Sequence, residues 1–306
     1  MPAPVASPFE KIEFVKMEGC GNDYIFLDCF AGGVPRDPAG LARILSDRHV
    51  GIGGDGLVLV LFSQKADVRM RIWNADGSEA EMCGNAIRCV GKLAYERGLA
   101  TSNPMTVETA AGIRTLELSV RDGQVSCARV HMGSASFDPA RLPAEAERYD
   151  FVRHPSGVWQ GTLEADGETL AVSLCSMGNP HAVVHVRDTD RFPVTRIGPL
   201  LERHPCFPRR ANIGFAQVAG PDAIRLRVWE RGSGETLACG TGACAAAAVS
   251  AALGLCGRKV DVTLPGGTLR IETPREGPVH MTGPCRTAFE GTVRVPPAED
   301  LSRESQ

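Results

Sequence analysis

Asn74-Ala-Asp-Gly-Ser-Glu-Ala-Glu-Met-Cys-Gly-Asn85 recurs 156 positions later as Glu230-Arg-Gly-Ser-Gly-Glu-Thr-Leu-Ala-Cys-Gly-Thr241. Aligned without gaps, the two stretches share a glutamate and a Cys-Gly pair, which is Cys83-Gly84 in the first and Cys239-Gly240 in the second. An apolar, helix-like segment follows each pair. A cysteine repeated at the start of two similar helices indicates an internal duplication.

The repeat extends beyond these stretches. Gly98 and Gly254, also 156 positions apart, follow the two predicted helices, where a glycine commonly ends a helix. Upstream, Gly21-Asn22 recurs as Gly178-Asn179 at an interval of 157. The chain is therefore predicted to consist of two similar halves, with equivalent thiols that face each other across the seam.

Size and charge limit the classes of partner. The chain has 306 residues, of which 43% are hydrophobic and 23% charged, as expected of a folded protein of two domains. Its formal net charge of −3 disfavours nucleic acid and anionic membranes, which would require a basic excess. We therefore expect a small polar molecule as the partner, with no nucleic acid and no membrane.

The cysteines indicate a reducing compartment. There are 11 of them, an odd number, and the N-terminus has no apolar core of the export-signal type, so a cytoplasmic protein with free thiols is predicted. No Cys-x-x-Cys pair occurs, so a zinc site is not expected. The uncharged segment 236–257 predicts a buried helix, because it has too few large aliphatic side chains for a membrane span.

Strands outnumber helices in both halves. The predicted strands are 12–17, 24–29, 57–62, 68–73, 106–109, 114–120, 125–132, 161–174, 182–187, 213–218, 224–229, 260–264, 269–273 and 287–295. The predicted helices are 38–47, 86–97 and 242–253. This pattern is typical of an α+β fold in which each mostly antiparallel sheet wraps a central helix. It leaves open which half the last strand joins.

The stretch Gly51-Ile-Gly-Gly-Asp-Gly56 matches the G-x-G-x-x-G pattern of dinucleotide sites. Such a site needs a strand before the glycines and a helix after them. Here the predicted order is reversed, so the stretch is interpreted as a tight turn and no nucleotide cofactor is expected.

A cysteine at the start of a helix has distinctive chemistry. The unpaired N–H groups and the positive end of the helix dipole can lower a thiol pKa from about 8.5 to roughly 3.5–7.5. The same N–H groups bind carboxylates, and Gly84 or Gly240 would let the backbone approach such a group. Cys83 and Cys239 are therefore candidate catalytic thiols.

Two such helix ends, facing each other, could hold an α-carboxylate with one sulfur on each face of the α-carbon. A thiolate would remove the α-proton, and a thiol would return a proton to the opposite face, each contributing typically about 10²–10⁴ in rate. The pattern predicts two-base inversion of an amino acid without metal or pyridoxal phosphate. His181, which pairs with Tyr24 in the repeat, and Glu230 are candidates to tune the thiols.

The sequence resembles the diaminopimelate epimerase family from about Phe14 to Val295. Besides the two cysteine stretches, the second of which is preceded by Trp229, the resemblance rests on three motifs. These are Lys16-Met-Glu-Gly-Cys-Gly-Asn-Asp-Tyr24, Arg48-His-Val-Gly-Ile-Gly-Gly-Asp-Gly56 and Gly178-Asn-Pro-His-Ala-Val183. Together these motifs are highly specific.

The resemblance implies two pseudo-symmetric domains, residues 1–131 with 285–306 and residues 132–284, in which the last strand returns to the first domain. It also implies closure of the domains over the substrate. The implied reaction is the interconversion of LL- and meso-2,6-diaminopimelate, on the route to lysine and peptidoglycan, by an isomerase without a cofactor. A homodimer is a further expectation.

The resemblance also assigns roles to single residues. Cys83 and Cys239 match the two acid/base thiols, and His181 and Glu230 match groups that assist proton movement. Glu230 also matches a contact to the reacting α-amino group. The amides that match the α-carboxylate site are those of Gly84, Asn85, Gly240 and Thr241. The residues that match other polar groups around the substrate are Asn22, Asn74, Asn179, Asn212 and Arg231, and several of these groups hold the distal carboxylate.

Two positions depart from the family pattern. Glu18 stands where a histidine is common, and Gly56 lies near a position where some members carry glutamine. Neither departure concerns the thiols, and both bear on the surroundings of the substrate.

Three other functions compete with this interpretation. A cofactor-independent racemase of another amino acid, such as histidine, is disfavoured because Arg231 with Asn74 and Asn212 suits a distal carboxylate. A thiol oxidoreductase using Cys83 and Cys239 would need a resolving cysteine at short spacing, which is lacking. A non-catalytic binding module leaves the duplicated thiols without a role.

Overall fold

The computed structural model describes residues 10–142, 144 and 146–295. Within this range the chain folds as two compact units. The first contains the described residues up to Ala128 together with those from Cys285 onward, and the second runs from Arg129 to Pro284. The N-terminal segment 1–9 and the C-terminal segment 296–306, which the sequence-based domain ranges include, lie outside the described residues.

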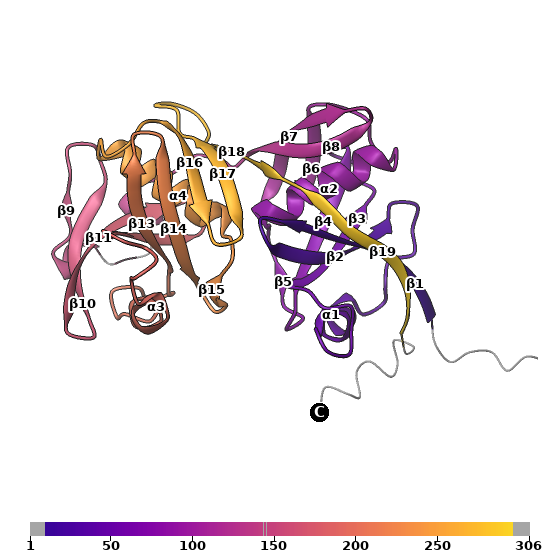
Figure 1. The fold of residues 1–306 in the computed structure, drawn as a ribbon, viewed down its shortest axis with the longest axis horizontal. Helices are drawn as coiled ribbons and strands as arrows, with labels where there is room; N and C mark the ends of the chain where they lie inside the picture. The colour runs from indigo at the N-terminus through magenta and orange to yellow at the C-terminus, as the bar shows by residue number, and fades with distance from the viewer. Residues whose placement is uncertain (1–9, 143, 145, 296–306) are drawn as a thin grey trace, which may run out of the picture. The chain divides into compact units, whose positions relative to one another are not determined.

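The first unit is a mixed, mostly antiparallel sheet with two helices (Figure 1). Its elements are β1 (Glu10–Gly19), β2 (Asn22–Cys29), α1 (Pro38–Ser46), β3 (Gly56–Leu61), β4 (Val68–Asn74), β5 (Glu79–Ala80), α2 (Gly84–Glu96), β6 (Met105–Thr109), β7 (Gly112–Arg121) and β19 (Arg286–Val295). The strand order is β19–β1–β2–β3–β4–β6–β7, in which only β2–β3 and β4–β6 are parallel. Strand β8 (Gln124–His131) continues into the second unit.

Helix α2 lies at the centre of the first unit. It contacts β1 to β4, β6 and β7, and all its residues from Gly84 to Ala94 are buried. Helix α1 packs against alternate residues of the parallel strands β2 and β3, among them Ile25 and Leu57. The sheet therefore holds the start of α2, and with it Cys83, in a fixed place.

The second unit repeats this arrangement. Its elements are two short 3₁₀ turns (Pro139–Arg141 and Ala146–Tyr149), β9 (Val152–Arg153), β10 (Trp159–Ala165), β11 (Glu168–Ser176), β12 (Pro180–His185), α3 (Val194–Glu202), β13 (Asn212–Gly220), β14 (Ala223–Glu230), β15 (Gly234–Thr236), α4 (Gly240–Ala252), β16 (Lys259–Leu264), β17 (Gly267–Glu272) and β18 (His280–Pro284). Strands β9 to β14 follow one another in the sheet, and β16, β17 and β18 continue it from β14.

Helix α4 is the buried helix predicted from the uncharged segment. It contacts β11 to β14 and β16 to β18, and its residues Gly242–Ala251 are buried. Alanine and glycine allow this close approach, because they need little space between the helix and the strands around it. Among the described residues, no helix has the length and apolar character needed to cross a membrane.

The two units match element by element. Helices α2 and α4 both have 13 residues, and helices α1 and α3 both have 9. In each pair the two helices start 156 positions apart. Strand β19 pairs with β1 in the first unit as β10 pairs with β11 in the second. Strand β19, the last strand that the structure describes, thus completes the first unit. The predicted α+β fold with an internal duplication is confirmed.

The secondary structure predicted from the sequence was wrong at 161–174, and it missed helix α3 and the strands β5, β9, β15 and β18. The single strand predicted at 161–174 is a hairpin of β10 and β11, because Asp166 (φ 54°) and Gly167 (φ 76°) form a tight turn between them. Helix α3 was not predicted, since Pro199 lies inside it and interrupts the helical pattern.

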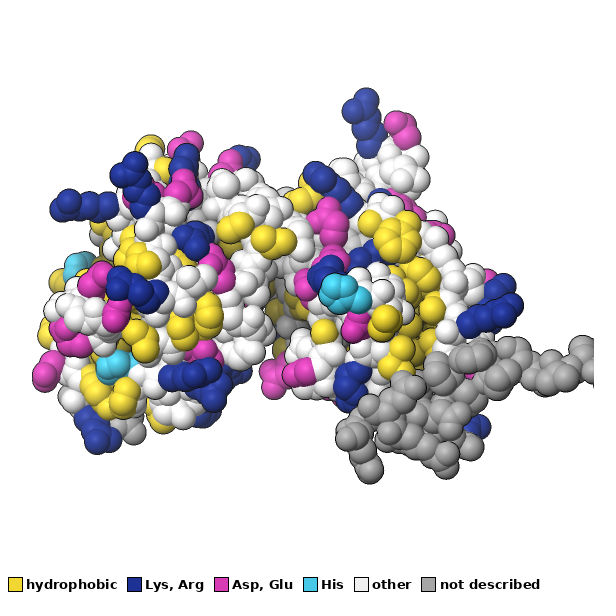
Figure 2. All heavy atoms as spheres, turned by 60° about the horizontal axis from the view of Figure 1, so that its bottom comes forward, with side chains coloured by type: hydrophobic (Ala, Val, Ile, Leu, Met, Phe, Trp, Pro, Cys, Tyr) yellow, Lys and Arg dark blue, Asp and Glu magenta, His cyan; other side chains and the backbone are white. Residues whose placement is uncertain are grey.

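Basic and acidic side chains are interspersed on both units in the face shown in Figure 2. This mixture agrees with the small net charge of −3. All 11 cysteines are free thiols.

Candidate active site

The first candidate thiol is the N-cap residue of α2. Cys83 has extended backbone angles (φ −129°, ψ 120°), and its sulfur accepts a hydrogen bond from the backbone N–H of Ala86 at 3.5 Å. The side chain is half-buried. The thiol therefore lies at the positive end of the helix dipole, as the sequence predicts.

The thiol of Cys83 belongs to a small polar network. It donates to Oδ1 of Asn22 at 3.3 Å, and Nδ2 of Asn85 donates to the same oxygen at 3.3 Å. Nδ2 of Asn22 donates in turn to the Asp55 carboxylate at 2.7 Å. Because Asp55 can only accept, it turns the carbonyl oxygen of Asn22 toward Cys83. Burial raises the pKa of Asp55, against hydrogen bonds from the Asp23 N–H and the Asn22 amide that lower it.

A buried cation lies under the first turn of α2. Arg88 is completely buried, and its guanidinium donates to the carbonyl oxygen of Gly84 and to Oδ1 of Asn85, both at 3.0 Å. Since Oδ1 of Asn85 is held by Arg88, Nδ2 of Asn85 points to Asn22. Arg88 thus fixes the side-chain amide of Asn85, a predicted substrate-binding residue. Sequence reasoning missed both Asp55 and Arg88.

Asn74 and the two departures from the family pattern lie near this network. Asn74 ends β4, and its amide donates to Oγ of Ser78 at 3.0 Å. Gly56 pairs with Asn74 across the sheet, and a Cβ on Gly56 would collide with the carbonyl oxygen of Trp73. A larger residue therefore does not fit at position 56. The carboxylate of Glu18 accepts from the N–H of Gly21 at 2.9 Å and so shapes the turn before Asn22.

The second candidate thiol, Cys239, is the N-cap residue of α4 and is only 5% exposed. Its sulfur donates to Oε2 of Glu230 at 3.1 Å, while Thr236 donates to the other carboxylate oxygen at 2.6 Å. Burial and the adjacent charge of Glu230 raise the pKa of Cys239 well above its usual value. Both units thus have a thiol at a helix start, and the thiol of Cys239 faces a carboxylate.

His181 reaches this thiol through two other side chains. It is 1% exposed, and its Nε2 lies 2.9 Å from Oδ1 of Asn179. Asn179 donates to Oγ1 of Thr241 at 3.2 Å, and Thr241 lies 3.7 Å from the Cys239 sulfur. Burial, with a smaller effect of Arg231, lowers the pKa of His181 to about 3. His181 is therefore neutral at physiological pH and donates to Asn179.

Asn212 holds the backbone around Arg231. Its Nδ2 donates to the carbonyl oxygen of Pro180 at 2.9 Å, and its Oδ1 accepts from the N–H of Arg231 at 2.9 Å. The Arg231 guanidinium contacts the carbonyl oxygen of Arg209 at 3.4 Å. Sequence analysis predicted substrate contacts for Asn212, and here its amide bonds to main-chain groups.

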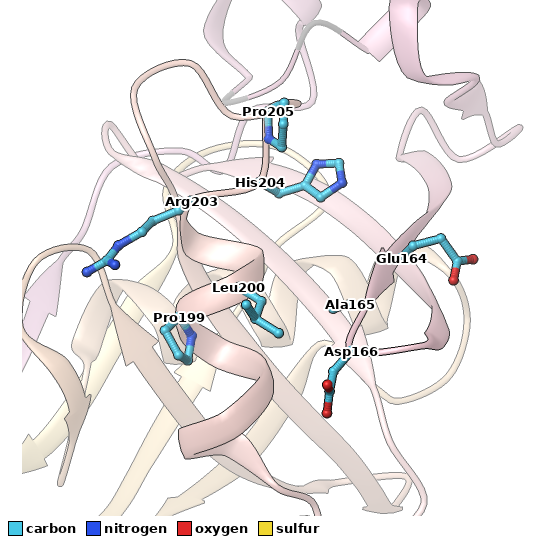
Figure 3. A pocket seen from close by; sticks show the side chains of 8 residues that line it. All are labelled: Glu164, Ala165, Asp166, Pro199, Leu200, Arg203, His204 and Pro205. Atoms are coloured by element: carbon cyan, nitrogen blue, oxygen red, sulfur yellow. The ribbon is translucent and has the colours of Figure 1, made fainter.

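A separate pocket of about 360 Å³ lies in the second unit (Figure 3). It opens between the β10–β11 turn and the end of α3. Its described lining, which includes no sequence-predicted site residue, is Glu164, Ala165, Asp166, Pro199, Leu200, Arg203, His204 and Pro205. The described residues also contain no group of three or more His, Cys, Asp or Glu side chains placed to hold a metal ion.

Comparison with known proteins identifies the family. A model of the family "Diaminopimelate epimerase" matches residues 14–137 and 173–288. The chain belongs to the diaminopimelate epimerase family. A diaminopimelate epimerase of Acetivibrio thermocellus is 48% identical over 92% of this chain and 98% of its own length. One of Methanococcus maripaludis strain S2 is 44% identical over 93% of this chain and 100% of its own length.

Membership of the diaminopimelate epimerase family confirms both the predicted relationship and the predicted class of enzyme, an isomerase. Solved structures with the same fold are more distant. A hydroxyproline epimerase from Agrobacterium vitis has a TM-score of 0.66 at 19% identity and covers 95% of this chain and 94% of its own. A phenazine biosynthesis protein of the PhzF family from Bacillus anthracis has a TM-score of 0.64 at 17% identity and covers 94% and 100%.

Proposed function

We propose that this protein interconverts LL- and meso-2,6-diaminopimelate by two-base proton transfer, without pyridoxal phosphate or metal. Family membership supports the substrate. The observation that carries the mechanism is the pair of thiols, Cys83 and Cys239, at the starts of two equivalent helices. The proposal requires the two helix starts to face the same α-carbon.

The proton balance of the reaction is simple. One sulfur, as thiolate, takes the α-proton and becomes a thiol, while the electrons of the broken C–H bond remain on the substrate as a carbanion. The other sulfur, as thiol, gives its proton to the opposite face and becomes a thiolate. The protonation states of Cys83 and Cys239 are thereby exchanged, and the reverse reaction uses them in the opposite roles.

The helix starts provide the binding site for the reacting end of the substrate. In this proposal the backbone N–H groups of Gly84, Asn85, Gly240 and Thr241 bind the α-carboxylate, because unpaired N–H groups at a helix start attract anions. Such fixed donors stabilise the negative charge that develops in the carbanion. Glu230 accepts a hydrogen bond from the Cys239 thiol, and we assign to it the contact to the reacting α-amino group.

The remaining assignments follow the same proposal. His181, through Asn179 and Thr241, and Glu230 assist proton movement at Cys239. Arg231 can clamp the distal carboxylate with two hydrogen bonds, and the polar groups that accompany it are Asn22, Asn74, Asn179 and Asn212. This distal carboxylate site distinguishes diaminopimelate from histidine as substrate.

The wider role is part of the proposal. The reaction would serve lysine and peptidoglycan synthesis in the cytoplasm, where 11 free thiols remain reduced. We also propose that the two domains, with the boundaries predicted from the sequence, close over the substrate and that the protein forms a homodimer. The exposed apolar side chains Phe62 and Phe289 of the first unit are available for subunit contact.

Proton NMR in D₂O tests the proposal. The enzyme is incubated with LL-diaminopimelate, and the α-proton signal and the appearance of the meso isomer are followed. We expect deuterium at the α-carbon of the product, because the returning proton comes from a thiol that exchanges with solvent. Absence of exchange with diaminopimelate, together with exchange of histidine, would establish the alternative racemase instead.

A further inference from the structure

Helix α3 ends in a buried carboxylate. Glu202 is the last residue of α3 and is 2% exposed, whereas Leu200 and Arg203 beside it line the surface pocket in Figure 3. A buried carboxylate is costly unless hydrogen bonds satisfy it. Its partners therefore indicate why it is there.

The two hydrogen-bond donors to Glu202 flank two predicted site residues in the sequence. Its Oε2 accepts from the indole Nε1 of Trp229 at 2.9 Å, and its Oε1 accepts from the backbone N–H of Gly232 at 3.0 Å. Glu230 and Arg231 lie between these two donors in the sequence. One carboxylate thus holds the chain on both sides of the dipeptide that is assigned to bind the substrate.

The fold supports this contact from both ends. Trp229 packs directly on α3, where a Cβ at Gly198 would come within 2.7 Å of the indole ring. After Arg231 the chain turns through Gly232 (φ 82°) into β15, and Glu230 pairs with Gly234. Arg210 also approaches Oε1 of Glu202, at 3.5 Å. Glu202 therefore links α3, the end of β14 and the turn that follows.

The first unit provides an internal comparison. Ser46, the last residue of α1, is equivalent to Glu202, and Trp73 is equivalent to Trp229. Ser46 is buried, and its hydroxyl has no hydrogen-bond partner among the described residues. The residues after Trp73 are Asn74 and Ala75, so this half has no Glu-Arg pair. The same packing therefore exists without a carboxylate where there is no such pair to position.

We propose that Glu202 is a positioning residue for the reaction, which sets the directions of Glu230 and Arg231 by holding the main chain on either side of them. The inference rests on the proposed function and adds a specificity-determining residue that does not itself touch the substrate. Arg231 would place the distal carboxylate, and Glu230 would place the amino group and the Cys239 thiol.

Glu202→Gln tests this role. Glutamine has nearly the same size, but it has only one acceptor oxygen and directs an NH₂ group at one of the two donors. We expect kcat/KM for LL-diaminopimelate to fall by roughly tenfold to a hundredfold, because small displacements of catalytic groups cost about that much. Both an increased KM and a decreased kcat are expected, since Arg231 and Glu230 would move together.

Ile197→Val is the matched control. Ile197 is completely buried on the same helix, and its hydrocarbon side chain cannot form a hydrogen bond to the turn. It should lower the melting temperature while leaving KM and kcat unchanged. Trp229→Phe keeps the ring against Gly198 and removes only the indole donor, so it tests the contact should Glu202→Gln fail to fold. In the Trp229→Phe background, Glu202→Gln should cost less than in the wild type.

Hydrogen exchange provides a readout that needs no turnover. The amide hydrogens of peptides covering 229–234 should exchange faster in Glu202→Gln than in wild type. In Ile197→Val their exchange rate should equal that of the wild type. Wild-type KM and kcat in Glu202→Gln, with only a lower melting temperature, would overturn the inference. An inactive wild type would instead refute the proposed function, and the exchange of the 229–234 peptides would still decide whether Glu202 positions the turn.

Discussion

The thiol of Cys239 donates to the carboxylate of Glu230 at 3.1 Å, whereas its counterpart Cys83 donates to the neutral amide of Asn22 at 3.3 Å. The duplicated halves therefore give their two thiols different partners. A nearby carboxylate disfavours the thiolate, while a neutral acceptor does so much less. This difference provides the first test of the site.

Replacing Glu230 by glutamine should lower the pKa of Cys239. Burial raises this pKa most, and the charge of Glu230 raises it further, so removal of the charge shifts it downward. At a fixed neutral pH, methyl methanethiosulfonate should then modify Cys239 faster, as measured by mass spectrometry across a pH series. Cys83 in the same molecules is the internal control, and an unchanged rate at Cys239 would contradict the role of Glu230.

Cys83→Ala and Cys239→Ala should each abolish epimerisation while the protein remains folded. In the proposed scheme one thiol serves each face of the α-carbon, and the loss of one positioned acid or base costs typically about 10²–10⁴ in rate. Turnover is measured by NMR and folding by circular dichroism. Cys244→Ala is the matched control, because Cys244 is buried in α4, the helix that Cys239 caps, and is not assigned to the site. Substantial turnover in either of the first two variants would refute the two-base scheme.

Much of this architecture could be predicted from the sequence. The helix starts and their cysteines were predicted because a local pattern is repeated at a fixed interval. The turn at Asp166-Gly167 was also visible in the sequence but was assigned to a continuous strand. Helix α3 was obscured by Pro199.

The partners of the site residues could not be predicted in this way. Asp55 contacts Asn22 across 33 positions, and Glu202 contacts Trp229 across 27. Such contacts depend on which strands become neighbours, so a pattern within one segment does not show them. Arg88 lies within one turn of Asn85, but that its side chain turns inward follows from the sheet around α2.

Acid should destabilise the protein through His181. Its pKa is about 3 in the folded protein and about 6.5 when unfolded, so between these values the unfolded chain binds a proton that the folded chain does not. Stability from this group is therefore complete above about pH 6.5 and is lost as the pH falls toward 3, by at most about 1.4 kcal/mol per pH unit. His181→Asn should flatten the pH dependence of the urea midpoint. His49→Asn, at an exposed position, should leave it as steep as in wild type, and an equally steep curve in His181→Asn would contradict the prediction.

Mild oxidation should inactivate the enzyme reversibly by joining Cys83 to Cys239. If both sulfurs flank one α-carbon, closure without substrate brings them within reach of a disulfide, which requires Cα atoms no more than about 7 Å apart. Diamide treatment followed by peptide mapping should show this cross-link, dithiothreitol should restore activity, and bound diaminopimelate should protect. Cys244→Ala should behave as wild type. Activity that is indifferent to diamide, with both thiols still free, would contradict this prediction and mean that the two sulfurs do not come within disulfide range.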